Sequence, residues 1–318
     1  MRRLLGAARR RALSLLTPAD QGAGAQSPDG RAAAESPIAR QARQQSTLPQ
    51  HLLDRDPLEA VSRHESRAVY LGEETVLCRV LGKYLVYADA QETGITPHLC
   101  MDGYWESWIT VVLARTLRPG WHCLDVGANH GYYTLVMADA VGRDGRVAPV
   151  EPTPRLAELL RETLDVNGFP DVPVVQKAAS RTDGETLRLV VPQHRSMNAR
   201  LSEVAGPTDA VFDVQTVTVD ALTREWPRVD LVKIDVEGAE EAVWEGMQRT
   251  ITQNPGLVLI LELNVDRYED PQTFLQAIER AGFRLRYIDI DAEVKDVTTE
   301  ELLRRHVGQD WMLYLTRG

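Results

Sequence analysis

The chain has 318 residues, a formal net charge of −10, 43% hydrophobic residues and 26% charged residues. This length allows one large α/β domain with appendages or two small domains, and the composition is typical of a soluble globular protein. Nucleic-acid binding needs a basic surface that neutralises phosphate groups, so the acidic balance argues against a nucleic-acid partner.

The cysteines and the apolar runs bear on the cellular compartment. Cys78, Cys100 and Cys123 have no metal-binding spacing, and a sparse, odd set is typical of a reducing compartment rather than of a disulfide framework. No apolar run reaches the roughly 18 residues that suggest a membrane-spanning helix. We therefore expect a cytoplasmic protein.

The first 50 residues differ in composition from the rest of the chain. Residues 1–16 contain five arginines and no acidic residue, and this basic, amphipathic pattern favours either a solvated tail or weak contact with an anionic membrane surface. Residues 17–50 are rich in Gln, Ala, Ser, Pro and Gly, a composition that cannot form a packed core. We predict that residues 1–50 are a disordered, basic and low-complexity segment.

Residues 51–104 are predicted to form a small N-terminal extension. Within it, two apolar runs over residues 75–89 flank a glycine-containing turn, which predicts a β-hairpin. The stretch 102–118 then predicts a helix that ends before a Pro-Gly pair. The main domain is predicted to cover residues 105–318.

Strands and helices are predicted to alternate in the main domain. Strands that are apolar on both faces imply helices on both sides of a sheet, so the pattern predicts an α/β fold with a doubly wound, mostly parallel sheet of the Rossmann type. The last strand is expected to be antiparallel. The predicted strands are 121–127, 145–152, 172–180, 185–192, 210–219, 229–235, 257–264, 283–290 and 310–317, and the predicted helices are 131–141, 154–168, 239–251 and 270–282.

Ligands bind at the carboxyl ends of the strands in such sheets, so the residues after each strand are candidates for a site. Gly127 and Gly131 follow the first strand, where a missing Cβ lets the backbone approach a ligand. Asn129 stands where the dinucleotide fingerprint Gly-x-Gly-x-x-Gly needs its second glycine. The loop therefore favours S-adenosyl-L-methionine over a nicotinamide dinucleotide.

Side chains at neighbouring strand ends fit the same cofactor. Asp125 ends the first strand and suits the cationic methionine end, and Glu151 ends the second, where its carboxylate can accept hydrogen bonds from two ribose hydroxyls. A plain tight turn beside a surface glutamate is the alternative. The predicted cofactor-binding residues are Asp125, Gly127, Asn129, Gly131, Glu151 and Ala178, the last from the end of the third strand.

Three stretches, "CLDVGANHGYYTLVMA", "VAPVEPTP" and "LVKIDVEGAE", together resemble the FkbM family of S-adenosylmethionine-dependent methyltransferases. The resemblance covers roughly residues 100–265, and "KIDVEGAE" is its most specific element. It implies methylation of hydroxyl oxygens, often on sugars or natural products. "GYWESWIT" resembles the lead-in helix of the family and points to Glu106, whereas His130 stands where the family commonly has an aliphatic residue.

The chemistry of methyl transfer points to the acids after the fourth strand. The acceptor oxygen must be positioned in line with the methyl group, and an alcohol needs help from a base or a metal. Asp235 is predicted to be the general base or to orient the acceptor hydroxyl. Glu237 is predicted to share this role or to cap the following helix. A Mg²⁺ or Mn²⁺ site formed by Asp235, Glu262 and Asn264 is open but not favoured, because no compact ligand motif supports it.

Three other side chains have an alternative interpretation. His194 lies in a loop between two strands and could act as a base near neutral pH, although a loop histidine is more often only solvated. Trp105 and Trp108 suit stacking on a sugar, but their spacing on a predicted helix favours the core.

The sequence as a whole predicts a methyltransferase that uses S-adenosyl-L-methionine to methylate a hydroxyl of a small-molecule or glycan acceptor, such as a carbohydrate or a secondary metabolite. A nicotinamide-dependent oxidoreductase on the same sheet is one alternative, and the absent dinucleotide fingerprint argues against it. A catalytically silent scaffold that binds the cofactor is the other.

Overall fold

The computed structural model describes residues 48–304 and 310–317. The basic tail and most of the low-complexity segment predicted for residues 1–50 therefore lie outside the described residues. Within the described part, none of the helices combines the length and the apolar character that crossing a membrane requires.

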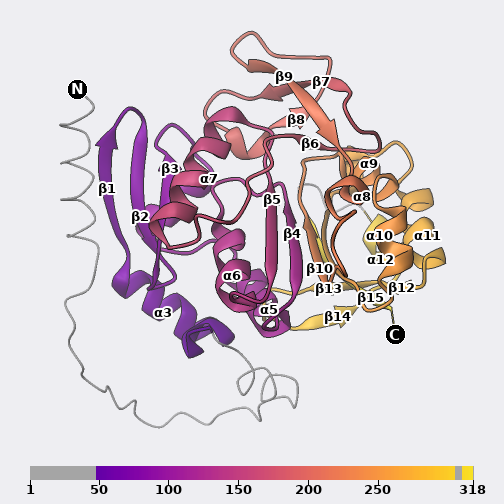
Figure 1. Cartoon of the computed structure of the whole chain (residues 1–318), viewed down its shortest axis with the longest axis horizontal. Coiled ribbons are helices and arrows are strands. Elements are labelled where there is room, and N and C mark those ends of the chain that lie inside the picture. Colours follow the sequence, from indigo (N-terminus) through magenta and orange to yellow (C-terminus); the bar gives the residue numbers. More distant parts are fainter. Residues whose placement is uncertain (1–47, 305–309, 318) are drawn as a thin grey trace.

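The main domain is built on a mixed sheet with the strand order β14-β13-β15-β11-β10-β4-β5, and β12 pairs with β15 (Figure 1). The neighbours β5, β4, β10 and β11 are parallel to one another, whereas β15 runs antiparallel to β11. The predicted doubly wound, mostly parallel sheet with an antiparallel last strand is confirmed. The strands are β4 (His122–Val126), β5 (Arg146–Val150), β10 (Leu231–Ile234), β11 (Val258–Leu263), β12 (Phe283–Arg284), β13 (Arg286–Ile288), β14 (Val294–Asp296) and β15 (Trp311–Arg317).

Two apolar clusters lie on opposite faces of this sheet. Successive side chains of a strand point to opposite faces, and Leu259 and Ile260 of β11 accordingly enter different clusters. One cluster contains α5 and α6, and the other contains α9, α10 and α11. The helices of the domain are α5 (Ser107–Thr116), α6 (Tyr132–Val141), α7 (Pro154–Val166), α8 (Val219–Leu222), α9 (Glu240–Glu245), α10 (Gln248–Gln253), α11 (Pro271–Arg280) and α12 (Thr299–Leu303).

The N-terminal extension is a three-stranded antiparallel sheet with two helices. Its β2–β3 pair is the predicted hairpin, which is confirmed, while β1, α3 and α4 were not predicted. The small sheet packs against the main domain through a cluster of Leu77, Leu85, Tyr87 and Leu159 of α7. The predicted domain boundary between residues 104 and 105 stays a prediction. The elements are η1 (Gln50–Leu53), α3 (Arg55–Glu65), β1 (Arg67–Gly72), β2 (Thr75–Val80), β3 (Tyr84–Asp89) and α4 (Ile95–Met101).

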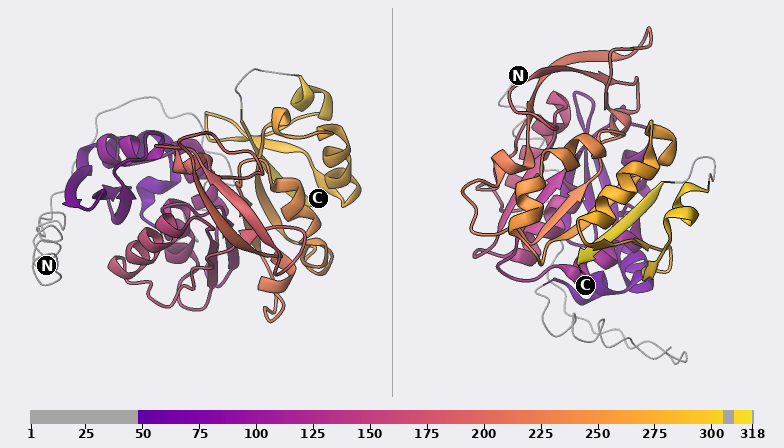
Figure 2. Two further views of the ribbon diagram at one scale, coloured as in Figure 1. Left: turned by 90° about the horizontal axis from the view of Figure 1, so that it is seen from above. Right: turned by 90° about the vertical axis from the view of Figure 1, so that its right-hand side faces the viewer.

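A second small sheet, with the order β6-β9-β7-β8, is inserted between α7 and α8. Figure 1 and the right-hand view of Figure 2 show it standing at one end of the central sheet. The two predicted extra strands correspond to β7 and β9, which pair antiparallel. The elements are β6 (Ala178–Ala179), β7 (Thr186–Val191), η2 (Ser196–Asn198), β8 (Arg200–Leu201) and β9 (Ala210–Val217).

The predicted third strand, residues 172–180, is wrong over most of its length. Val175 forms one parallel bridge with Val150 of β5, and Pro173 has no N–H to donate to a longer ladder. The end of the segment, β6, leaves β5 and pairs with β9 instead. The segment thus borders the central sheet and then crosses into the inserted one.

Three predicted elements are shorter than expected. The helix predicted for residues 239–251 divides into α9 and α10 at Gly246, where an added Cβ would lie 2.1 Å from the carbonyl oxygen of Ser180. The strand predicted for 283–290 divides into β12 and β13. The helix predicted to begin near residue 102 begins only at Ser107, because Glu106 adopts a left-handed conformation with φ of 37°.

The loops that follow β4 and β10 touch at Gly127. A Cβ at this position would lie 1.7 Å from the carbonyl oxygen of Asp235, and φ is +83°. Only glycine allows both the left-handed backbone and the close approach of the second loop. The contact therefore fixes how far apart the two loops can be.

This contact predicts a large loss of stability for Gly127→Ala. Gly168 is a matched control, because its φ is +82° and an added Cβ there would meet nothing within 4 Å. Gly168→Ala should lower the free energy of unfolding by about 1–2 kcal/mol, the cost of a left-handed non-glycine residue. Gly127→Ala should cost at least about 2 kcal/mol more, because backbone must move. Equal losses in denaturant titrations would contradict the contact.

Candidate active site

An open pocket lies at the carboxyl ends of β4, β5, β10 and β11. The empty space in and around it, open solvent included, is about 1020 Å³. Its floor consists of the loops that follow these strands. The inserted sheet and the N-terminal extension supply the remaining wall through Ile95, Leu189, Met197 and Leu201. The pocket is thus located where ligands bind in doubly wound sheets.

Glu151 holds the loop after β4 in place. One of its carboxylate oxygens accepts a hydrogen bond from the Asn129 backbone N–H at 2.9 Å, and the other accepts from the Thr153 N–H at 2.8 Å. Burial raises the pKa of Glu151, while these hydrogen bonds oppose that rise. Each carboxylate oxygen has a second lone pair, so Glu151 keeps acceptor capacity towards the pocket that it lines.

Asn129 adopts a left-handed backbone conformation with φ of 51°, which asparagine tolerates better than most residues. Its side-chain oxygen accepts a hydrogen bond from the His130 N–H at 2.8 Å. Gly127 and Gly131 were predicted to let the backbone approach a ligand, but their missing Cβ atoms make room for other parts of the protein. The missing Cβ of Gly131 makes room for Leu160 of α7, since a Cβ would lie 2.2 Å from its Cδ1, as that of Gly127 makes room for the loop after β10.

Two predicted cofactor residues take different positions. Ala178 lines the pocket. Asp125 is 1% exposed and is not among the residues that line the pocket. One of its oxygens accepts a hydrogen bond from the Thr134 hydroxyl at 2.5 Å, while burial raises its pKa and the Lys233 ammonium opposes that rise. Its predicted contact with the methionine end therefore stays a prediction.

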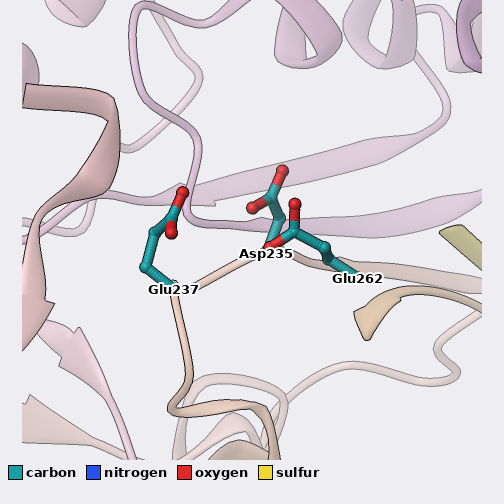
Figure 3. Close-up of side chains that lie close together, drawn as sticks. All are labelled: Asp235, Glu237 and Glu262. Carbon is teal, nitrogen blue, oxygen red and sulfur yellow. The ribbon is translucent and has the colours of Figure 1, made fainter. Parts of the chain in front are cut away.

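Asp235, Glu237 and Glu262 meet at the other end of the pocket, each with a carboxylate oxygen within 4.8 Å of the others. Figure 3 shows the three carboxylates, which come from the ends of the adjacent strands β10 and β11, gathered around one space. Asp235 pairs at 2.8 Å with Lys233, a buried lysine that is 1% exposed. The ammonium gives Asp235 a fixed counter-charge.

Arg267, in η3 (Val265–Arg267), bridges the other two acids. One guanidinium nitrogen lies 2.8 Å from a Glu237 oxygen, and another lies 2.6 Å from a Glu262 oxygen. Burial raises the pKa of Glu237 to about 7 and raises that of Glu262 as well, Asp235 adds to both rises, and Arg267 opposes them. The cluster thus contains three acids and two cations, and the raised pKa values mean that the three acids are not all ionised near neutral pH.

The ion-pair partners of the three acids bear on whether the acids could bind a metal ion. Carboxylate oxygens suit Mg²⁺ or Mn²⁺, but Lys233 and Arg267 already bind all three carboxylates. Asn264, the third residue of the metal site that the sequence left open but did not favour, caps η3 and donates to Asp310 at 2.7 Å. These residues fit two protein cations better than a metal ion.

Glu237 does not act as a helix cap. Helix α9 begins at Glu240 with no side-chain cap hydrogen bond. Glu240 braces the loop instead, because its carboxylate accepts hydrogen bonds from the Val236 and Gly238 N–H groups at 3.1 and 3.2 Å. The Glu237 side chain is left to face the pocket and Arg267.

Glu106 adds a fourth carboxylate to the acidic end of the pocket, beside Asp235, Glu237 and Glu262. It precedes α5 in the left-handed conformation, which is strained for a residue of its size. The Tyr133 hydroxyl donates a hydrogen bond to it at 2.8 Å, and burial followed by the nearby Asp235 charge raises its pKa to about 7. The resemblance pointed to Glu106, but its strained backbone and the role of Tyr133 had no signal in the sequence.

The pocket wall also includes an aromatic side chain and an imidazole group. Trp105 precedes α5 and lines the pocket, so its predicted position on a helix is wrong. His130 also lines it, and burial lowers its pKa to about 3. The Nε2 atom of this neutral imidazole accepts a hydrogen bond from the Asp89 N–H at 3.0 Å, which ties the loop after β4 to β3.

His194, the alternative base, is not among the pocket-lining residues. Its carbonyl oxygen accepts hydrogen bonds from the Thr93 N–H and hydroxyl at 2.9 and 2.8 Å. Next to this contact, Met197 fills the space beside Gly94, where a Cβ would lie 2.0 Å from the sulfur. His194 therefore helps join the inserted sheet to the extension across the pocket.

The raised pKa of Glu106 predicts a pH trend in stability. The folded protein keeps the Glu106 proton up to about pH 7, whereas the ordinary carboxyl value is 4.5, so ionisation weakens the folded state as pH rises between these values. Glu106→Gln cannot ionise and should become progressively more stable than the wild type across this interval. Denaturant titrations at several pH values measure the difference.

The matched control for this trend is Glu158→Gln, because the Glu158 side chain is 66% exposed. Its stability relative to the wild type should not change over the same pH interval. A pH-independent difference between Glu106→Gln and the wild type would contradict the raised pKa.

Short stretches of the chain are similar to curated protein-L-isoaspartate O-methyltransferases. The identity is 43% over 65 residues with the protein of Ignicoccus hospitalis, which covers 20% of this chain and 31% of that protein. The identity with the protein of Methanopyrus kandleri is 46% over 52 residues, and the matched stretch covers 16% of this chain and 23% of that protein. The matches thus span less than a third of these relatives.

Two solved structures illustrate the distant likeness in three dimensions. An O-methyltransferase from Bacillus cereus in complex with SAH gives a TM-score of 0.38 at 14% identity, covering 72% of this chain and 84% of that one. Precorrin-6y C5,15-methyltransferase from Geobacter metallireducens gives a TM-score of 0.39 at 12% identity, covering 67% and 88%.

Residues 125–285 match the methyltransferase FkbM domain family. The match begins at the end of β4, includes the inserted sheet and extends past α11, so it contains the loop after β4, Glu151 and the three clustered acids. It covers about half of the chain, and the chain belongs to the FkbM methyltransferase domain family.

Proposed function

We propose that this protein is an S-adenosyl-L-methionine-dependent methyltransferase that methylates a hydroxyl oxygen of a carbohydrate or secondary metabolite. Its family supports methyl transfer. The observation that carries the proposal is one pocket with two different ends, in which Glu151 and the loop after β4 face four carboxylates at the ends of β10, β11 and the turn before α5.

The Glu151 end suits the adenosine half of the cofactor. A buried carboxylate with acceptor capacity left after two backbone hydrogen bonds can bind the two vicinal hydroxyls of a ribose. Because Glu151 also fixes the Asn129 amide, the same side chain shapes the loop and receives the sugar. Ala178 and Ala179 leave room for a flat base on the neighbouring wall.

The acidic end suits a positively charged methyl donor. Glu106, Asp235, Glu237 and Glu262 share this end with the cations Lys233 and Arg267. A sulfonium and an ammonium group would favour the ionised form of these acids, whose pKa values are raised when no further cation is bound, since opposite charges attract strongly in a partly dehydrated site. The excess of carboxylates thus favours S-adenosyl-L-methionine over an anionic cofactor.

The acceptor hydroxyl is assigned to the space between Asp235 and Glu106. Lys233 holds one Asp235 oxygen, which leaves the other to orient the hydroxyl in line with the methyl group. Bound S-adenosyl-L-methionine would supply the methyl group, and Glu106, whose pKa of about 7 suits a base near neutral pH, would take up the proton that the acceptor hydroxyl loses. Trp105 offers a face for a sugar ring beside these acids.

Cofactor binding tests the first half of the proposal. Isothermal titration calorimetry with S-adenosyl-L-homocysteine should detect binding to the wild type, and Glu151→Ala should weaken it about 10- to 100-fold, because hydrogen bonds to a charged group are lost. Glu158→Ala, on the exposed side of α7, should bind as the wild type does. A thermal melt of each variant shows that it is folded.

Two results would reject this part of the proposal. One is a wild-type protein that binds no S-adenosyl-L-homocysteine. The other is a folded Glu151→Ala variant that binds it with unchanged affinity. Binding of NADH in place of S-adenosyl-L-homocysteine would favour the oxidoreductase alternative.

Methyl transfer tests the second half. Transfer of a labelled methyl group from S-adenosyl-L-methionine to a panel of methyl glycosides and hydroxylated aromatic compounds should identify an acceptor. With it, Asp235→Asn should lower kcat about 100-fold, because the acceptor hydroxyl is no longer held in line with the methyl group, and should change the affinity for S-adenosyl-L-homocysteine far less. Asp296→Asn is the control, because its side chain is 72% exposed and far along the sheet. Wild-type turnover in folded Asp235→Asn would contradict the assigned role.

A further inference from the structure

Two of the three cysteines lie next to each other in the N-terminal extension. Cys78 is in the middle of β2 and Cys100 is in the last turn of α4, and their sulfur atoms are 3.4 Å apart. Cys78 is buried and Cys100 is half-buried. A disulfide needs its sulfurs at about 2.05 Å, so the two sulfur atoms would have to approach each other further for a bond to form.

The surroundings of the two thiols differ in a way that suits sequential reaction. A hydrogen bond between the sulfurs, together with burial, raises the pKa of the Cys78 thiol, whereas accepting that hydrogen bond lowers the pKa of Cys100. The thiolate is the nucleophile in thiol–disulfide exchange. Cys100 is therefore the thiol that meets a reagent from solvent, and Cys78 is the thiol that follows it.

We propose that Cys78 and Cys100 form a reversible disulfide site whose reaction partner is a small disulfide of the glutathione type. In the first step the Cys100 thiolate attacks oxidised glutathione, forming a mixed disulfide and releasing one glutathione thiolate. In the second, Cys78 attacks the Cys100 sulfur, loses its proton and releases the second glutathione. Two protein thiols are oxidised and one glutathione disulfide is reduced to two thiols.

The backbone around the pair is suited to hold the bond. Helix α4 packs directly against β1 and β2, and the Ser66 hydroxyl donates a hydrogen bond to the Cys100 carbonyl at 2.9 Å. These contacts keep the helix end beside the strand before any bond forms. The third thiol, Cys123, lies buried in β4, where burial raises its pKa, and it serves as an internal control.

The bond would act on one wall of the pocket. Helix α4 begins at Ile95, which lines the pocket, and the chain that leaves α4 reaches Trp105 and Glu106, which line it as well. Joining Cys100 to Cys78 fixes the middle of this segment to β2. The oxidation state of the pair thus governs the rigidity of a wall that the methyl acceptor would contact.

Counting thiols in the full chain tests the proposal. The reduced protein should titrate three cysteine thiols after denaturation, and the protein equilibrated with oxidised glutathione should titrate one, with a tryptic peptide pair that joins Cys78 to Cys100. The bond should raise the thermal midpoint by several degrees, because it closes a loop between residues 22 apart. Dithiothreitol should restore all three thiols.

Single variants make the result specific. Cys123→Ser should lose both remaining thiols on oxidation, whereas Cys100→Ser should keep Cys78 and Cys123 as thiols and show no rise in the thermal midpoint. The proposal is overturned if the wild type keeps three thiols, if glutathione stays attached to Cys100, or if the joined peptides include Cys123.

Hydrogen exchange tests the link to the pocket separately. Amides of residues 95–106 should exchange at least about 10-fold more slowly in the oxidised protein than in the reduced protein, since a tethered helix opens less often. Amides of α11, which packs in the other apolar cluster, should not change. A disulfide that forms without slowing exchange in residues 95–106 would overturn this part of the inference, whatever the protein's reaction proves to be.

Discussion

The approach of the loop after β4 to the loop after β10 sets the geometry of the whole pocket. Gly127 lies against the Asp235 carbonyl so closely that no side chain fits between them. The parallel neighbours β4 and β10 bring their carboxyl ends to the same edge of the sheet. The contact at Gly127 leaves no space between the loops that follow these two strands. The loop that Glu151 shapes and the acids that follow β10 therefore open into one pocket. One small ligand can therefore contact both loops.

Charge is the second constraint on the site. Lys233 is buried beneath Asp235, and Arg267 bridges Glu237 and Glu262, so the protein has placed its own cations where a metal could otherwise sit. Removing one partner of such a buried pair strongly destabilises the folded protein, because the other charge is left uncompensated, even though the pair itself contributes little net stability. The acids are thus held in fixed positions, and the remaining acceptor capacity is directed at the pocket. Glu106 accepts a hydrogen bond from the Tyr133 hydroxyl, and its pKa of about 7 lets it exchange a proton near neutral pH.

The alternation of buried strands and helices was predictable because it depends on local periodicity. The strands β4, β10 and β11 are apolar on both faces, a pattern that predicts strands in the middle of a sheet covered by helices on both sides. The prediction of a third strand over residues 172–180 is wrong because Pro173 cannot donate a ladder hydrogen bond. In addition, Ala178 pairs with β9 of the inserted sheet, which the apolar pattern did not indicate. For the site, the strand-end rule placed Glu151 and Asp235 at the pocket. It could not show that Asp125 lies beneath the pocket wall, because β4 alone does not reveal which way a strand-end side chain points.

Contacts between distant parts of the chain explain what the sequence could not indicate. Arg267 meets Glu237 across a gap of thirty residues, and Cys78 meets Cys100 through the docking of a helix that was not predicted. The extension also reaches the site by hydrogen bonds from Thr93 to the His194 carbonyl and from Asp89 to His130. Because these bonds join the extension to both the inserted sheet and the loop after β4, the extension is a structural part of the pocket. A chain shortened to the family-matched residues would lack Glu106 and Trp105, and with them the wall that faces the acids.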